Sequence, residues 1–163
     1  MPVRSETREL LHFQAVQEIV RQRFTFPTEK HPHYKTYINV PQRSMGVRAN
    51  SRVVYPDIVI VQDPENYTKM VGQVETAETV NEEQAPEWAV HAGLGPLYLY
   101  VPVGYAERAK KLCQKFKAEV VGIRSWRQVV GYEELEISDY FTQWGGPEDL
   151  APGPLGDVLK RLL

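Results

Sequence analysis

The stretch VVYPDIVIVQ (residues 53–62) is followed, after the polar segment DPENYTK, by VGQVETAET (residues 71–79). Both stretches are short apolar runs with polar residues set into them, a pattern typical of β-strands. The polar segment between them is short enough to form a turn. The spacing therefore predicts two strands, at about 53–62 and 69–76, that pair as an antiparallel hairpin.

Three polar side chains interrupt these runs, namely Asp57, Gln73 and Glu75. Burying such groups on a sheet is costly unless something compensates. Residues two apart in a strand share a face, so Gln73 and Glu75 point the same way. Cross-strand neighbours come within about 5.5 Å, so Asp57 can converge with Glu75. Two carboxylates and an amide oxygen form a hard-ligand cluster that suits Mg²⁺. The alternative is that the two acids cap local backbone groups or face solvent.

Working outward from the hairpin, the elements alternate between helices and strands. Residues 6–24 have apolar residues at helical period, with Ser5 as a candidate N-cap. A strand is predicted at 34–40 and a loop at 41–52. A short helix at 81–95 connects to a buried strand at 96–103. The helix makes this connection a crossover, so the last strand can lie parallel to a neighbour.

The chain after residue 103 is also predicted to form helices and strands. The stretch GYAERAKKLCQKFKAEV (104–120) predicts an amphipathic helix, whose apolar face includes Cys113 as a core residue. Further strands are predicted at 120–126 and 128–137. A Gly/Pro-rich connector (142–156) then leads to a short terminal helix (157–163). The fold class is therefore α/β, a mixed sheet flanked by helices.

The composition sets the class of protein. The 163 residues are 42% apolar and 25% charged, which suits one soluble globular domain with its own core. No apolar run is long enough to span a bilayer, and the first ten residues contain no apolar signal region. The single cysteine excludes an internal disulfide. We therefore expect a cytoplasmic protein without a membrane partner.

Charge is distributed unevenly along the chain. Residues 1–54 carry nine Lys/Arg and four Asp/Glu, whereas residues 55–163 carry ten and seventeen. A basic half can meet phosphate groups, although random surface scatter would give the same counts. Arg43, Arg48 and Arg52 flank Gly46 in the predicted loop, which indicates either a loop that contacts a DNA backbone or a solvated loop.

Two short motifs carry a resemblance to a known family. The dipeptide PD at 56–57, followed by QVE at 73–75, resembles the bipartite motif of the PD-(D/E)xK nuclease superfamily, which includes restriction endonucleases, junction resolvases and repair nucleases. The predicted element order over residues 6–103 matches the superfamily's αβββαβ core, so the resemblance covers about two thirds of the chain. The stretch QVETAETVNEEQAPEW, followed by GPLYLYVP, is also similar to the Uma2-like branch. Residues 104–163 then form a C-terminal extension.

The resemblance implies an endonuclease that hydrolyses DNA with Mg²⁺ or Mn²⁺. Asp57, Gln73 and Glu75 would be the catalytic residues. Asp57 and Glu75 would hold the metal with an acid of the first helix, for which Glu9, and after it Glu6, projects with the Phe13/Val20 face. Both helical acids also have the favourable charge for a helix N-terminus. Arg43, Arg48 and Arg52 would contact DNA, and many nucleases of this fold act as homodimers.

The chain departs from the superfamily pattern at two positions. Gln73 stands at the acidic position, and Glu75 stands at the lysine position, although some relatives place an acid there. Others move the lysine to the following helix, but residues 70–109 contain no lysine, and His91 is the only basic side chain in the predicted helix. A histidine there is more typical of a half-exposed helical residue. The alternative is therefore a catalytically inactive nuclease-fold module that binds nucleic acid or a protein partner.

Overall fold

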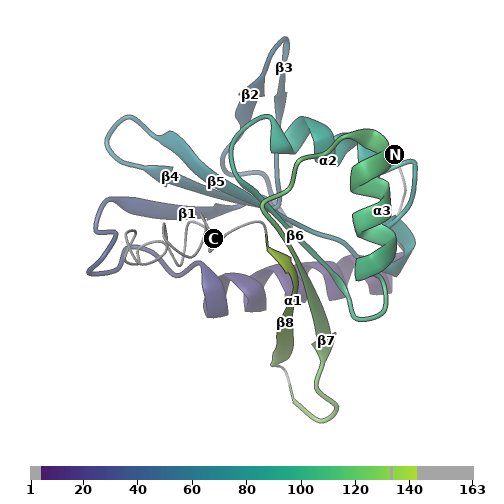
Figure 1. The fold of residues 1–163 in the computed structure, drawn as a ribbon. Helices are drawn as coiled ribbons and strands as arrows, with labels where there is room; N and C mark the ends of the chain where they lie inside the picture. The colour runs from purple at the N-terminus through teal and green to yellow at the C-terminus, as the bar shows by residue number, and fades with distance from the viewer. Residues whose placement is uncertain (1–4, 133, 143–163) are drawn as a thin grey trace, which may run out of the picture.

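The structure is a computed structural model that describes residues 5–132 and 134–142. It contains a six-stranded sheet of order β1-β4-β5-β6-β7-β8 and a two-stranded sheet of β2 and β3 (Figure 1). The strands are Tyr34–Ile38 (β1), Val47–Ala49 (β2), Arg52–Val54 (β3), Ile58–Gln62 (β4), Tyr67–Val74 (β5), Leu97–Pro102 (β6), Gly122–Gln128 (β7) and Leu135–Thr142 (β8). The helices are Glu6–Arg23 (α1), the 3₁₀-helix Ala77–Thr79 (η1), Ala85–Ala92 (α2) and Ala106–Phe116 (α3). The predicted terminal helix, and the predicted connector after residue 142, lie outside the described residues.

The sheet is mixed, as the sequence predicts. The hairpin is confirmed, because β4 and β5 pair antiparallel with Ile58 opposite Gly72. β6 lies parallel to β5, with Val71 opposite Leu97, since α2 carries the chain back along the sheet. β7 is parallel to β6, and the outer strands β1 and β8 are antiparallel to their neighbours.

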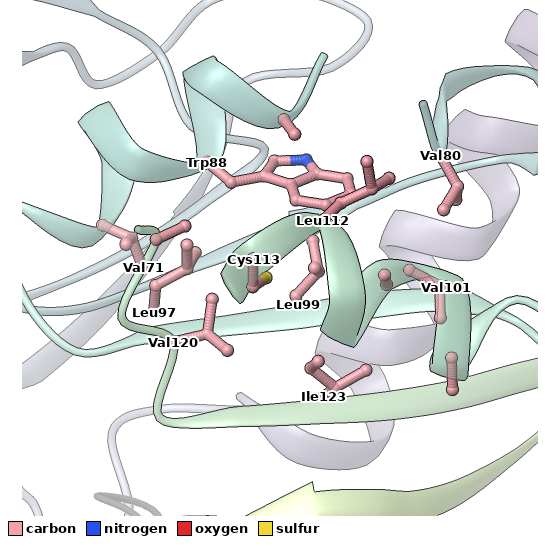
Figure 2. Packing of buried hydrophobic residues seen from close by; sticks show 14 residues of the cluster. Val71, Val80, Trp88, Leu97, Leu99, Val101, Leu112, Cys113, Val120 and Ile123 are labelled. Carbon is pink, nitrogen blue, oxygen red and sulfur yellow. The ribbon is translucent and has the colours of Figure 1, made fainter. Parts of the chain in front are cut away.

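Helices cover both faces of the sheet. β6 shows this directly, because Tyr98 and Tyr100 pack in the cluster formed with α1, whereas Leu97, Leu99 and Val101 pack in the cluster formed with α2 and α3. This division follows the alternation of side chains along a strand. Figure 2 shows the cluster under α2 and α3, in which Cys113 is buried as predicted.

The buried face of α1 agrees only in part with the face predicted from the helical period, which consists of Leu10, Phe13, Val16, Val20 and Phe24. Val16 and Phe24 are buried. Leu10 keeps 56% of its surface exposed, and Phe13 and Val20 are only partly buried. Apolar residues occupy a broad arc of this helix, so the period predicts a buried stripe without defining its centre. The stripe that faces the sheet is shifted by about one residue and consists of His12, Ala15, Val16 and Ile19.

The predicted strand at 53–62 is divided in two. Tyr55, Pro56 and Asp57 separate β3 from β4, because Pro56 has no N–H to donate to a strand ladder. β3 pairs instead with β2, which lies within the predicted loop at 41–52, and the two form a projecting arm (Figure 1). The break sets Asp57 immediately before β4, where its carbonyl accepts a hydrogen bond from Asn39 N at 3.0 Å.

Other elements begin or end at different residues from those predicted. The helix expected at 81–95 is shorter, with Pro86 in its first turn as predicted. α3 ends at Phe116 because Lys117 takes a left-handed conformation, with φ 56°. The strand expected at 128–137 begins later, since β7 runs on to Gln128. None of the described helices is long and apolar enough to cross a membrane.

Candidate functional site

A polar hollow of about 290 Å³ lies where α1, β3, α2 and the start of β4 meet the end of β5. We call it the Asp57 pocket. Five residues singled out from the sequence line it, although they belong to five different segments of the chain: Glu9, Arg43, Arg52, Asp57 and Gln73. The tertiary structure therefore gathers most of the predicted site residues in one place.

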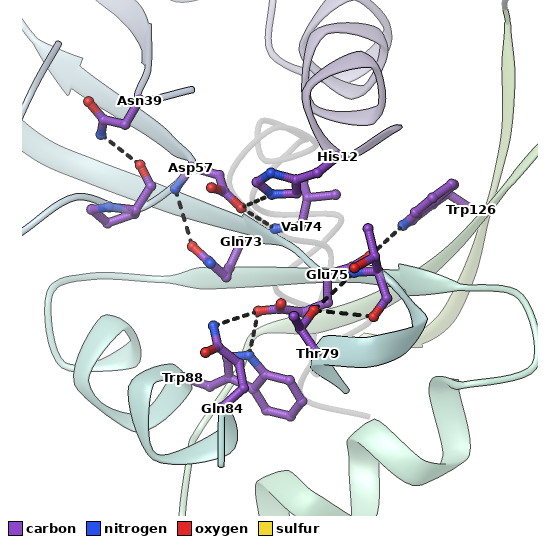
Figure 3. A network of polar contacts seen from close by, with 12 residues as sticks. His12, Asn39, Asp57, Gln73, Val74, Glu75, Thr79, Gln84, Trp88 and Trp126 are labelled. Atoms are coloured by element: carbon purple, nitrogen blue, oxygen red, sulfur yellow. Dashed lines mark hydrogen bonds and ion pairs between the residues drawn. The ribbon is translucent and has the colours of Figure 1, made fainter. Parts of the chain in front are cut away.

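Asp57 is 6% exposed, and its carboxylate is held from two sides (Figure 3). Oδ2 accepts a hydrogen bond from His12 Nε2 at 3.0 Å and another from Val74 N at 2.9 Å. Because the carboxylate is the acceptor, Nε2 of His12 carries the proton in this contact. Oδ1 makes no hydrogen bond to any residue that the structure describes. Asp57 therefore offers the pocket one oxygen atom while the other fixes its orientation.

Asn39 fixes the position of the chain segment that leads to Asp57. Its side chain donates to Pro56 O at 2.7 Å and to Met45 O at 2.9 Å. Its Oδ1 accepts from Ser44 N and Met45 N. One buried amide thus ties the loop after β1, which carries Arg43, to the segment that precedes β4.

Gln73 lies beside Asp57, as the strand register predicts. Its Oε1 accepts a hydrogen bond from Asp57 N at 3.2 Å, and only 7% of the residue is exposed. The amide nitrogen makes no hydrogen bond within residues 5–132 and 134–142, and Gln73 lines the pocket. With this amide orientation, Gln73 presents a neutral donor to the pocket.

The prediction that Glu75 joins Asp57 and Gln73 in one cluster was wrong. Glu75 is fully buried and does not line the Asp57 pocket. Its Oε2 accepts hydrogen bonds from Trp88 Nε1 at 2.8 Å and Gln84 Nε2 at 3.1 Å, both from the α2 side (Figure 3). A buried indole N–H needs an acceptor, and Glu75 supplies it. The carboxylates of Asp57 and Glu75 thus bind different partners, and the burial of Glu75 is compensated by α2 within the protein itself.

The remaining predicted residues divide between the pocket and its surroundings. Glu9 lines the pocket, whereas Glu6 is exposed and does not. Arg52 donates to Glu87 Oε2 at 2.9 Å, so its charge is partly neutralised at the pocket wall. Arg48 lies elsewhere, in a hollow between the β2–β3 arm and α2.

Two histidines line the pocket that sequence reasoning did not place there. His12 follows Glu9 by three residues, so helical spacing would have placed it on the same side of α1. His91 was expected to be half-exposed, but it is only 6% exposed. Burial lowers the pKa of His91, while the charges of Asp57 and Glu87 oppose that shift.

The pocket lining includes carboxylates of the kind that bind hard cations. Mg²⁺ is usually held by one or two carboxylates together with substrate phosphates and water. Asp57 and Glu9 line the pocket, as does Glu87, which is bound by Arg52. Among residues 5–132 and 134–142, no group of three or more His, Cys, Asp or Glu side chains is arranged to hold a metal ion. The described side chains therefore do not form a metal site by themselves.

Comparison of the chain with models of protein families, with curated proteins and with solved structures found no match. The resemblance to the PD-(D/E)xK superfamily therefore remains an expectation from the motif residues and from the predicted order of the elements.

Proposed function

We propose that the protein is a divergent PD-(D/E)xK-type domain that hydrolyses phosphodiester bonds of DNA slowly in the presence of Mg²⁺ or Mn²⁺. The observation that carries this proposal is the meeting of Asp57, Gln73 and Glu9 in one pocket with Arg43 and Arg52. Carboxylate and amide oxygens bind divalent ions, and guanidinium groups bind phosphates, so a pocket with both suits a metal ion and a phosphodiester together.

Each residue has a distinct part in this proposal. Asp57 and Glu9 would hold the metal, which when bound would activate a water molecule and neutralise charge on the phosphoryl oxygens. His12 and Val74 N orient the Asp57 carboxylate through Oδ2. Gln73 directs an amide toward the pocket and orients a ligand without adding charge.

The arginines extend the site toward the DNA backbone. Arg43 lies over the Tyr55 ring, 4.4 Å from its centroid, which restrains an otherwise exposed side chain. Arg52 is held by Glu87, which also lines the pocket. Contacts from such positions fix the register of a nucleic acid without reading its sequence.

A second candidate function is a nuclease-fold module that binds DNA without cutting it. The observation that favours it is the position of Glu75, which is held by Trp88 and Gln84 away from the pocket. In addition, no lysine in the described part of the chain lines the pocket. A donor of this kind contributes about 10²–10³-fold to rate in other hydrolases, so its loss favours binding over cleavage.

The deciding experiment incubates single- and double-stranded DNA with the protein in Mg²⁺ and in Mn²⁺. We expect slow cleavage, faster in Mn²⁺ because that ion binds N/O ligands more strongly than Mg²⁺. Asp57→Asn should abolish cleavage, whereas Asp63→Asn, the same charge change at the exposed β4–β5 turn, should leave it unchanged. Metal-dependent cleavage that survives Asp57→Asn would exclude this site, and DNA binding without cleavage by the wild type would establish the second candidate.

A further inference from the structure

His91 is a pocket side chain whose hydrogen-bonding capacity is not used by any of the described residues. It lies near the end of α2 and is only 6% exposed. Nδ1 is buried and has no hydrogen-bond partner, and the ring makes no hydrogen bond to any other residue of 5–132 and 134–142. Because unpaired polar groups are costly to bury, an imidazole in this state calls for a partner that the described part of the chain does not supply.

The neighbouring charged groups already have partners within the protein. Asp57 Oδ2 is bound by His12, and Arg52 is bound by Glu87. Arg43 stacks on Tyr55 from the loop after β1. A ligand that enters the pocket therefore meets His91 as a side chain that can form a new hydrogen bond without breaking one.

The chemistry of the pocket selects the ligand class. Burial lowers the pKa of His91 against the opposing charges of Asp57 and Glu87, and this direction favours the neutral ring, which carries one N–H donor. Asp57, Glu87 and Glu9 provide no donors, and an anionic oxygen is the strongest acceptor for an imidazole N–H. A phosphodiester offers two such oxygens and would be flanked by the two arginines.

We propose that His91 is a binding residue for the phosphodiester group and that its imidazole donates a hydrogen bond to a phosphoryl oxygen. This inference rests on the proposed function and adds to it a specific contact on α2. It assigns to His91 the role of a neutral donor at a pocket that no lysine of the described residues lines.

The test uses the full chain labelled with ¹⁵N in its histidines and glutamines, in EDTA so that cleavage cannot interfere. The probe is a short DNA oligonucleotide, compared with the same sequence carrying uncharged methylphosphonate linkages. We expect the ring nitrogen signals of His91 and the side-chain amide of Gln73 to shift with the phosphodiester probe only. Spectra of His91→Gln assign the His91 signals.

Affinity measurements complete the test. His91→Ala should weaken binding about ten- to a hundred-fold, as for loss of a hydrogen bond to a charged group. His91→Gln should recover part of the affinity because an amide can donate, and His33→Ala, at an exposed position, should bind as the wild type does.

The outcomes separate the two proposals. If Gln73 shifts and His91 does not, or if His91→Ala binds as tightly as the wild type, the role of His91 is overturned while the pocket remains the DNA site. If neither residue shifts on addition of the phosphodiester probe, the role of His91 is overturned, and the cleavage assay in Mg²⁺ and Mn²⁺ decides the proposed function separately. Equal shifts with the methylphosphonate probe would overturn the hydrogen bond to an anionic oxygen.

Discussion

His12 on α1 and Asp57 at the start of β4 form a buried contact, with 3.0 Å between Nε2 and Oδ2. The contact joins residues that are 45 positions apart and ties the first helix to the central strands. Asp57 is therefore a structural residue as well as the proposed site residue. Experiments on its function need variants that separate the two roles.

Replacing Asp57 should reveal this structural role. Asp57→Ala removes the acceptor for both His12 Nε2 and Val74 N. We expect a loss of about 2–4 kcal/mol in the free energy of unfolding, because two buried donors lose their partner. Asp57→Asn should lose less, since the amide oxygen can still accept from Val74 N. Urea denaturation measures both, and an Asp57→Ala variant as stable as the wild type would contradict this account.

Glu75 should prove to be a core residue. Glu75→Ala leaves Trp88 Nε1 and Gln84 Nε2 without their acceptor, and we expect it to cost about 2–4 kcal/mol of stability. Glu75→Lys should be worse, because it buries a cation against two donors. Thermal denaturation followed by circular dichroism is the measurement, with Glu119→Lys as an exposed control of equal charge change. Placing a lysine at position 75, as the resemblance to the PD-(D/E)xK motif would suggest, is thus expected to unfold the protein, and a stable Glu75→Lys variant would refute the core role of Glu75.

Gln73→Glu should strengthen metal binding. The substitution adds a carboxylate next to Asp57, so the metal-free variant should be less stable than the wild type through charge repulsion. Mn²⁺ should raise its melting temperature more than that of the wild type, because a ligand that binds the folded state stabilises it by mass action. Gln17→Glu, on the exposed side of α1, serves as the control. Equal Mn²⁺ responses in all three proteins would argue against a metal site at Asp57.

Acid should destabilise the protein through His91. Burial lowers the pKa of His91 from its ordinary value of 6.5, so the unfolded chain takes up a proton at higher pH than the folded protein does. The contribution of neutral His91 to the free energy of unfolding is thus fully present above pH 6.5. It declines as the pH falls toward the lower pKa of His91 in the folded protein. Urea denaturation across this range should show a smaller loss for His91→Gln than for the wild type. Parallel curves for the two proteins would contradict the expectation.

Cys113 should be unreactive in the folded protein. Burial raises the pKa of its thiol to about 12, and the thiolate is the form that reacts. Mass spectrometry should therefore show slow alkylation by iodoacetamide at mildly alkaline pH and rapid alkylation in denaturing urea. Rapid alkylation under native conditions would show that α3 opens readily.

The sequence by itself determined the order of the helices and of the main-sheet strands, but it did not reveal β2, which lies in the predicted loop. Helical period marked α1 and α3, and two short apolar runs separated by a polar segment marked the β4–β5 hairpin. Alternation also placed Gln73 beside Asp57, because register within a hairpin is a local property of the chain. Even the division between β3 and β4 has a local cause in Pro56, although the apolar residues on both sides concealed it.

The tertiary structure decided which of the polar residues meet. Alternation sends Gln73 and Glu75 to the same face, but it does not say what packs there. Trp88 and Gln84 donate hydrogen bonds to the carboxylate of Glu75, whereas His12 donates one to that of Asp57. His12 is 45 positions from Asp57, whereas Gln84 and Trp88 are only 9 and 13 positions from Glu75. All three contacts depend on how a helix is rotated on the sheet, which is set by side-chain packing over the whole interface. A buried carboxylate binds the donors that packing brings to it, and for that reason only the folded chain distinguishes the pocket residue Asp57 from the core residue Glu75.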